Sequence, residues 1–191
     1  AHVCHGPSRI DLPLFGADPR LPAQPERAHE ATLRNATNIA SEVTRVAAKQ
    51  LKPPRGPGDW LAGVAIGPVG ARRYHLYRPP DLQSGERLPL LVMLHGCGQT
   101  SRDFAVTTRM NLLAARQRFF VLYPEQDRLA NPQRCWNWHD RRSGKADAEA
   151  ATLMAAVEQA CVHYPVDRDR IAVAGLSAGA SMAALLATRY P

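Results

Sequence analysis

From Trp60 onward, short apolar runs alternate with longer segments in which alanine, leucine and charged residues recur. The short runs predict strands over 64–66, 74–77, 88–94, 119–123 and 170–174, with a turn at 67–70. The longer segments predict helices over 104–117, 146–164 and 178–190. Strands that alternate with helices indicate an α/β fold, in which helices cover both faces of a mostly parallel sheet.

The first part of the chain follows a different pattern. Residues 1–25 contain five prolines and little periodicity, which predicts irregular structure. Residues 26–51 carry a broken apolar stripe at helical spacing, and the Pro- and Gly-rich stretch 52–58 predicts a linker. We therefore expect a leader, helix and linker over 1–58, and one domain over 59–191. No apolar signal segment is visible at the start of the sequence.

The pentapeptide Gly-Leu-Ser-Ala-Gly at 175–179 joins a strand-like run to an Ala- and Leu-rich helical segment. A serine between two glycines at such a turn is typical of a nucleophile elbow. We expect Ser177 to have a strained backbone with positive φ, and a β-carbon at Gly175 or Gly179 to crowd the turn. The helix N-terminus would favour negative charge developing beside the serine. The alternative is an ordinary Gly/Ser loop that caps a helix.

A serine that attacks an ester needs backbone N–H groups that stabilise the oxyanion of the intermediate. One donor is the residue after the nucleophile, here Ala178, and the other comes from a loop after an earlier strand. The sequence Leu-His-Gly-Cys-Gly at 94–98 suits this loop. Cys97 is the expected donor there, with Gly98 as the alternative. His95 precedes the glycine turn, so we expect it to brace the loop rather than act as a base.

Charge and composition narrow the class of function. Lys and Arg total 24 against 17 Asp and Glu, a net charge of +7, but the basic residues are scattered and no nucleic-acid-binding motif is present. We therefore expect a solvated basic surface without a nucleic-acid partner. No apolar run of about 18 residues could span a membrane. The four cysteines lack metal-binding spacing, and Cys161, within an apolar helical pattern, is expected to be buried.

Four sequence blocks resemble the polyhydroxybutyrate (PHB) depolymerase family of esterases, and related feruloyl and acetylxylan esterases. They lie at 94–100, 122–126, 134–138 and 175–179, within a match that covers roughly residues 60–191. The resemblance implies a three-layer αβα hydrolase fold, of which this chain holds the N-terminal half. It implies a serine esterase that needs no metal or organic cofactor. The implied substrate is a carboxylic ester, such as poly(3-hydroxyalkanoate) or its oligomers.

The resemblance also assigns site residues. Ser177 matches the nucleophile, and the backbone amides of Cys97 and Ala178 match the oxyanion hole. Resemblance and position together predict a Cys97–Cys135 disulfide, which would contribute about 4 kcal/mol in the chain-entropy model. The alternative is two free buried thiols. Such a bridge goes with an extracellular or periplasmic location, although a cytoplasmic one stays open.

Four residues are candidate substrate contacts. Gly98 and Gln99 follow the expected oxyanion donor, while Trp136 and Trp138 could form an apolar platform for an ester. The alternative for both tryptophans is that they anchor the core. The polar stretch 139–148 is expected to be a mobile surface loop, and its adjacent His and Asp do not form a triad pair.

The acid and the histidine of a serine hydrolase triad have no candidate after the serine. Fourteen residues follow Ser177, and none is Asp, Glu or His. We expect a longer protein to supply both groups together with further strands, and the 191-residue chain alone to be inactive. Without those strands, 170–174 would be an exposed apolar edge. The alternatives are a carbohydrate esterase of the feruloyl or acetylxylan type and a non-catalytic binding module. The sequence does not define an oligomeric state.

Overall fold

The computed structural model describes residues 53–191. The leader and helix expected over residues 1–51 lie outside the described residues, as does the first residue of the expected linker. Among the described residues, none of the helices combines the length and the hydropathy that crossing a bilayer requires.

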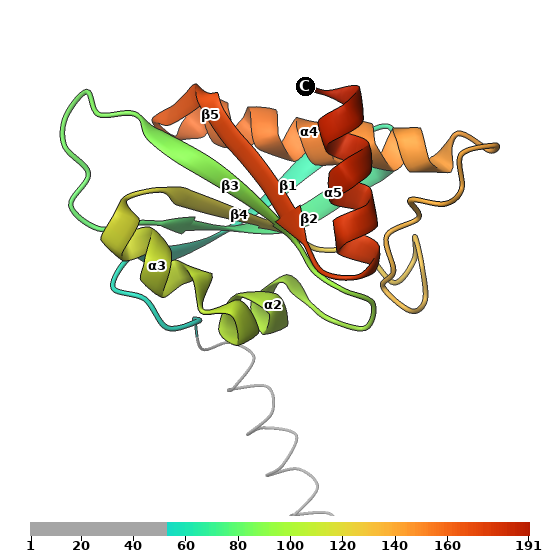
Figure 1. Ribbon diagram of the computed structural model, residues 1–191, viewed down its shortest axis with the longest axis horizontal. Helices are drawn as coiled ribbons and strands as arrows, with labels where there is room; N and C mark the ends of the chain where they lie inside the picture. Colours follow the sequence, from blue (N-terminus) through green and yellow to red (C-terminus); the bar gives the residue numbers. More distant parts are fainter. Residues whose placement is uncertain (1–52) are drawn as a thin grey trace, which may run out of the picture. The chain divides into compact units, whose positions relative to one another are not determined.

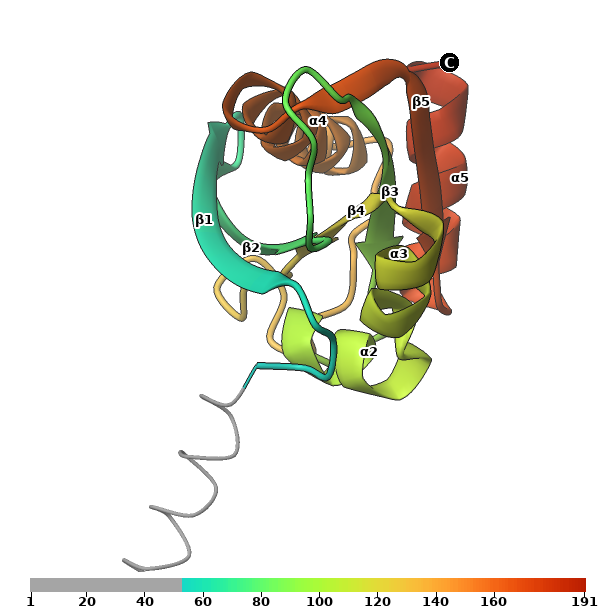
Figure 2. The ribbon, with the colours of Figure 1, turned by 90° about the vertical axis from the view of Figure 1, so that its left-hand side faces the viewer.

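Five strands form one mixed sheet in the order β1-β2-β4-β3-β5 (Figures 1 and 2). They are β1 (Asp59–Gly67), β2 (Gly70–Arg78), β3 (Leu88–Leu94), β4 (Phe120–Pro124) and β5 (Val166–Gly175). β1 and β2 are joined by the expected turn and run antiparallel, and β2 is also antiparallel to β4. β4, β3 and β5 are parallel. The parallel part of the predicted sheet is therefore confirmed, and the N-terminal hairpin makes the whole sheet mixed.

Helices cover both faces of this sheet, as expected. α4 (Lys145–His163) and α5 (Ala178–Arg189) lie on one face, and α2 (Ser101–Thr108) and α3 (Met110–Gln117) lie on the other (Figures 1 and 2). β3 alternates its side chains between the two layers, because successive residues of a strand point to opposite faces. Its even-numbered residues face α4 and α5, whereas Met93 packs with the other layer.

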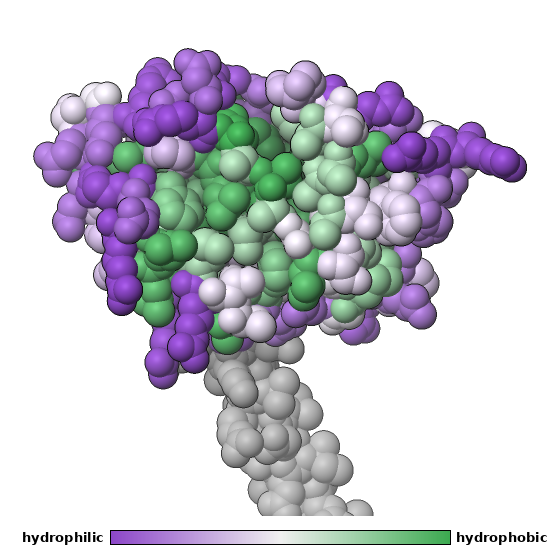
Figure 3. All heavy atoms as spheres, viewed as in Figure 1, coloured by the Kyte–Doolittle hydropathy of each residue, from purple (hydrophilic) through white to green (hydrophobic). Residues whose placement is uncertain are grey.

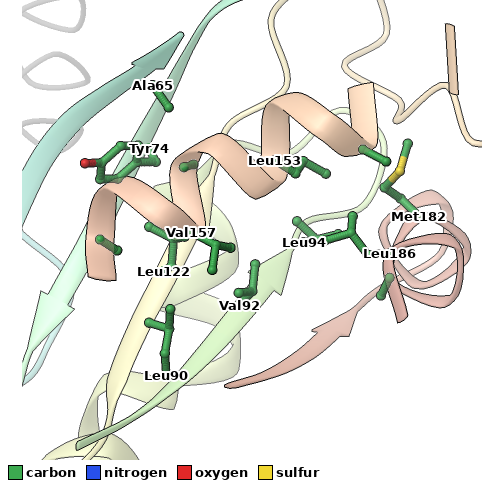
Figure 4. Close-up of a cluster of buried hydrophobic side chains, with 14 of the residues drawn as sticks. Ala65, Tyr74, Leu90, Val92, Leu94, Leu122, Leu153, Val157, Met182 and Leu186 are labelled. Carbon is green, nitrogen blue, oxygen red and sulfur yellow. The ribbon is translucent and has the colours of Figure 1, made fainter. Parts of the chain in front are cut away.

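The larger core lies between the sheet and α4 and α5. Figure 4 shows Leu94 of β3 beside Met182 and Leu186 of α5, while Val157 of α4 lies near Leu122 of β4. These five side chains are all at most 4% exposed. A strand that is covered on both faces needs apolar residues at nearly every position, which explains the unbroken apolar run of β3.

Two predicted segments differ from the structure. The helix expected over 104–117 is two helices, because Arg109 adopts a left-handed conformation with φ of 54°. α2 begins earlier than expected because Thr100 and Asp103 form a capping box, in which each side chain accepts a hydrogen bond from the other's backbone N–H. The expected mobile loop at 139–148 is wrong for its last four residues, which form the first turn of α4.

β5 is an open edge of the sheet, since it pairs with β3 alone among the described residues. Figure 3 shows an apolar area over this edge and beside α5. A groove of about 670 Å³ runs along one side of the strand, where Val157, Ile171 and Leu186 line it. A second groove of about 390 Å³ lies between Phe119 and Ile171. The expected apolar edge at 170–174 is thus present in the structure.

The open β5 edge predicts that the 191-residue chain self-associates as its concentration rises. Ile171→Lys places a charge on this edge and is expected to reduce the associated fraction several-fold, because lysine disfavours edge-to-edge pairing. The matched control is Val162→Lys, at a residue of α4 that is 72% exposed. Sedimentation velocity over a concentration series measures the effect. Equal association of the two variants would contradict a role for the edge.

Candidate active site

Ser177 lies between the end of β5 and the start of α5. Its φ is 53° and its ψ is −122°, so the predicted positive φ is confirmed. The residue is exposed, and its side chain makes no capping hydrogen bond to α5. A non-glycine residue in this conformation is strained, and such strain is found where function requires the side chain to be presented. The geometry is that of a nucleophile elbow, rather than of a serine cap on a helix.

The two glycines of the elbow allow the helix to approach the sheet closely. A β-carbon at Gly175 would collide with the backbone of Gly179, and one at Gly179 would collide with the carbonyl oxygens of Leu94 and His95. The backbone N–H of Leu176 donates a hydrogen bond of 3.1 Å to the Leu94 carbonyl. The expected crowding is therefore confirmed, and the elbow is held directly against the end of β3.

The loop after β3, residues 95–98, contains the amide of Cys97, which is the expected oxyanion donor. The Gly96 N–H donates to the Gln99 side-chain oxygen at 2.9 Å, and the Gly98 N–H donates to the Gln133 carbonyl at 2.8 Å. Within residues 53–191, the N–H groups of Cys97 and Ala178 donate no backbone hydrogen bond. The amide of Gly98 is thus engaged, whereas those of Cys97 and Ala178 have no backbone partner among these residues. We call residues 95–98, whose expected role is to bind an oxyanion, the oxyanion loop below.

The predicted disulfide between Cys97 and Cys135 is confirmed. It joins the oxyanion loop to the segment that follows β4, across a sequence separation of 38 residues. Closing a loop of this length contributes about 4 kcal/mol in the chain-entropy model. Cys161 is a free buried cysteine, as expected, and its burial raises the pKa of its thiol.

The two tryptophans near this bridge lie in different environments. Trp136 is fully buried, and its indole N–H donates to the His95 carbonyl at 2.8 Å. Trp138 is 39% exposed, with its ring edge-on to that of His139. Trp136 therefore fits the alternative of a core anchor. The expected platform of both rings is wrong for Trp136, because no part of its side chain is accessible to a substrate.

His95, the first residue of the oxyanion loop, is fully buried. Its Nε2 accepts a hydrogen bond of 3.0 Å from the Gln126 backbone N–H, so the proton resides on Nδ1, which donates to the Gly96 carbonyl at 2.8 Å. Burial lowers the pKa of His95, while the hydrogen bond to Gly96 opposes this shift. The side chain is a neutral brace for the loop, as expected, and it is not available as a base.

A second group of serine, histidine and carboxylate lies at the same edge of the sheet. The hydroxyl of Ser101 donates to Glu125 at 2.7 Å, and Nδ1 of His75 lies 2.9 Å from Oγ of Ser101. Here the serine stands between the histidine and the carboxylate, and it is only 1% exposed. The Ser101 proton is directed at the Glu125 carboxylate and not at His75, so this group lacks the order that activates a nucleophile.

Three buried polar residues under the oxyanion loop were not identified from the sequence. Arg72, Gln126 and Glu149 are each at most 2% exposed. The available signal was at Glu149, which follows Ala146 and precedes Leu153 at helical spacing on the buried side of α4. An acidic residue in an apolar stripe indicates a buried polar partner. Its partner, Arg72 on β2, is distant in sequence, and nothing in the neighbouring sequence indicated that this arginine would be buried.

The close approach at the elbow predicts that Gly179→Ala destabilises the domain by about 3 kcal/mol or more, because a backbone would have to move. Gly85→Ala is the control. Its φ is +79° and an added β-carbon would meet nothing within 4 Å, so only the left-handed conformation costs energy, about 1–2 kcal/mol. Urea unfolding at equilibrium measures both variants. Equal losses would show that the contact with β3 is unimportant.

The neutral state of His95 predicts a stability that depends on pH. The pKa of His95 is lowered in the folded state. The contribution of His95 to the free energy of unfolding is therefore complete above the unfolded pKa of about 6.5 and is lost as the pH falls below that value. For one such group, the free energy of unfolding changes by up to about 1.4 kcal/mol per pH unit. His95→Gln should reduce this pH dependence of the free energy of unfolding between pH 7 and pH 5. An unchanged slope in His95→Gln would contradict the assignment.

The fold is similar to that of solved esterases. It superposes on the acetyl xylan esterase from Aspergillus awamori with a TM-score of 0.57 at 21% identity, over 70% of this chain and 48% of that chain. A thermostable esterase gives a TM-score of 0.52 at 24% identity, over 69% of this chain and 38% of that chain. These likenesses confirm the predicted α/β-hydrolase fold.

Two curated proteins are similar in sequence. Poly(3-hydroxyalkanoate) depolymerase C of Paucimonas lemoignei is 34% identical over 104 residues, which cover 54% of this chain and 25% of that protein. Feruloyl esterase B of Neurospora crassa is 30% identical over 121 residues, which cover 62% of this chain and 40% of that protein. The chain therefore spans less than half the length of either relative.

The family described as esterase PHB depolymerase matches residues 72–191, which is more than half of the chain. This span contains the elbow, the oxyanion loop, the disulfide and the buried residues beneath the loop. On this match, together with the strained serine and the two available amides, the chain belongs to the PHB depolymerase family of esterases.

Proposed function

We propose that this chain is the nucleophile-bearing part of a serine esterase, which cleaves carboxylic esters through an acyl-enzyme on Ser177. The observation that carries the proposal is the elbow itself. A strained, exposed serine is held against a loop in which the amides of Cys97 and Ala178 have no backbone partner within residues 53–191. Two such amides stabilise the negative oxygen that forms when a serine attacks a carbonyl.

The reaction needs two groups that the described residues do not bring to the serine. A histidine must take the proton from the Ser177 hydroxyl and return it to the departing alcohol, and a carboxylate must orient that histidine. Water then releases the acyl group by the same route. We propose that further polypeptide, pairing with the open edge of β5, supplies both groups. The grooves on either side of Ile171 support this placement, since they leave apolar surface uncovered.

A polyester or its oligomers is the substrate that we favour. The relative from Paucimonas lemoignei is a poly(3-hydroxyalkanoate) depolymerase. Two exposed apolar side chains on the segment between β4 and α4 suit such a substrate, namely Trp138 at 39% and Leu129 at 95% exposure. Gly98 and Gln99 stay proposed contacts at the rim of the oxyanion loop. The side-chain oxygen of Gln99 is already engaged by Gly96, which leaves its amide N–H groups for a substrate.

A carbohydrate ester is the second candidate. It is favoured by the feruloyl esterase relative, which matches a larger share of this chain than the depolymerase does. An exposed aromatic ring such as that of Trp138 also suits a feruloyl group or a sugar face. Paired assays on suspended PHB and on feruloylated arabinoxylan distinguish the two substrates. Faster turnover of feruloylated arabinoxylan would favour the carbohydrate ester over the polyester as the substrate.

The missing acid and histidine predict that the 191-residue chain does not hydrolyse p-nitrophenyl butyrate above the level of its Ser177→Ala variant. A longer polypeptide that supplies both groups is expected to be active, and Ser177→Ala in it should lower kcat by about 10⁴-fold or more. A fluorophosphonate probe should label that polypeptide only when Ser177 is present.

Two outcomes would contradict this account. Turnover by the 191-residue chain that is lost in Ser177→Ala would show that the described residues already supply the acid and the base. A folded, longer polypeptide that the probe does not label would indicate a non-catalytic binding module.

A further inference from the structure

A buried ionic network lies beneath the oxyanion loop, and Glu149 of α4 is at its centre. The Glu149 carboxylate accepts hydrogen bonds from Arg72 Nη2 at 3.1 Å, from Gln126 Nε2 at 2.6 Å and from the backbone N–H of Asn137 at 2.7 Å. The side-chain amide of Asn137 adds a contact of 3.5 Å. Glu149 is 1% exposed and Arg72 is 2% exposed, so the ion pair is almost entirely removed from water.

One path from this carboxylate to the oxyanion loop runs through Gln126. Arg72 donates to the side-chain oxygen of Gln126, which directs the amide N–H groups of that residue toward Glu149 and the Cys135 carbonyl. The backbone N–H of Gln126 then donates to Nε2 of His95. The carboxylate thereby fixes the residue that holds the buried histidine in one tautomer.

A second path runs through the segment 133–137, which Glu149 holds at the Asn137 backbone. This segment supplies three links to the oxyanion loop. The Gln133 carbonyl accepts from Gly98, Cys135 forms the disulfide, and the Trp136 indole donates to His95. The guanidinium of Arg72 also lies 5.8 Å from the centre of the Trp136 ring. The two paths thus meet at the loop that carries the available amide.

Stability alone is a weak reason for such a pair. Removing two charges from water is costly, and an apolar pair of similar volume often stabilises a fold as well or better. A carboxylate offers something that an apolar side chain lacks, namely several directional acceptors in one place. Here those acceptors orient a side-chain amide and a backbone N–H from two different segments, and both segments end at the oxyanion loop.

We propose that Glu149, paired with Arg72, is a positioning residue for the oxyanion loop. It keeps the Cys97 amide directed toward the site by fixing Gln126 and Asn137. The catalytic consequence rests on the proposed esterase function, but the positioning itself can be measured in the 191-residue chain without turnover. An experiment can therefore contradict the effect on catalysis without contradicting the positioning role.

The first experiment compares Glu149→Gln with Glu158→Gln in the 191-residue chain. Glu158 is on the same helix and pairs with Arg168, but both its side chain and that of Arg168 are at least half exposed. By NMR, Glu149→Gln should increase hydrogen exchange of the Gly98 amide about tenfold or more relative to the core strands, since that amide loses a fixed acceptor. The nitrogen shifts of His95 should also lose the pattern of a single tautomer. Glu158→Gln should change neither signal.

A folded Glu149→Gln protein with unchanged Gly98 exchange and an unchanged His95 pattern would overturn the proposal. If Glu149→Gln does not fold, the double variant Arg72→Met/Glu149→Met takes its place, because it leaves no unpaired charge buried. It should fold and show the same faster exchange. If Gly98 exchanges at the original rate in the double variant, or if this variant also fails to fold, the Arg72–Glu149 pair has a purely stabilising role.

The second experiment uses the longer, active polypeptide. Loss of one oxyanion donor costs about 10²–10³ in kcat, so loosening the donor by Glu149→Gln should lower kcat by up to about 100-fold and leave KM nearly unchanged. A change confined to KM would contradict a role in the oxyanion loop. An inactive polypeptide whose Gly98 exchange still responds to Glu149→Gln would refute the esterase function and leave the positioning role intact.

Discussion

The contact between the elbow and the end of β3 is the constraint on which the rest of the site depends. Gly179 lies so close to the carbonyls of Leu94 and His95 that no side chain could be accommodated there. This contact sets the separation between Ser177 and the oxyanion loop by backbone packing. Backbone atoms have few alternative positions, so the geometry is fixed before any substrate arrives. Both glycines of the pentapeptide therefore determine the position of Ser177, the proposed nucleophile.

The oxyanion loop itself is short and has two exposed residues, so it requires support from elsewhere. Its glycines allow a tight bend but provide no side chains that pack. The support comes from the neutral side chain of His95, the Cys97–Cys135 disulfide and the carboxylate of Glu149. Each kind of support resists a different displacement. The disulfide limits separation of the loop from the next segment, while the hydrogen bonds of His95 and Glu149 limit rotation of the peptide planes.

The sequence predicted the parts of the site that depend on local pattern, and missed those that depend on pairing between distant segments. Strand β3 and the elbow have local signals, in an apolar run and in spaced glycines, so both were located correctly. Arg109 has no such signal, because a left-handed residue other than glycine is not expected from its type. The Arg72–Glu149 pair joins residues 77 apart in sequence. Burial of Trp136 likewise follows from the packing of its loop, which local spacing does not reveal.

Ser177, the proposed nucleophile, lies two residues after the end of the edge strand β5, and this placement bears on how the proposed reaction would be completed. In the proposed reaction, the two amides that would stabilise the intermediate lie in the segments that follow β3 and β5, and the described residues contain both segments. Proton transfer in the proposed reaction needs a histidine and a carboxylate that the described residues do not bring to the serine, and β5 is unpaired on one side. Polypeptide that pairs with this edge would cover the apolar grooves beside Ile171 and bring its own loop ends to the serine. Completing the sheet and completing the triad would then be the same event, because parallel strands place their carboxyl ends at one edge.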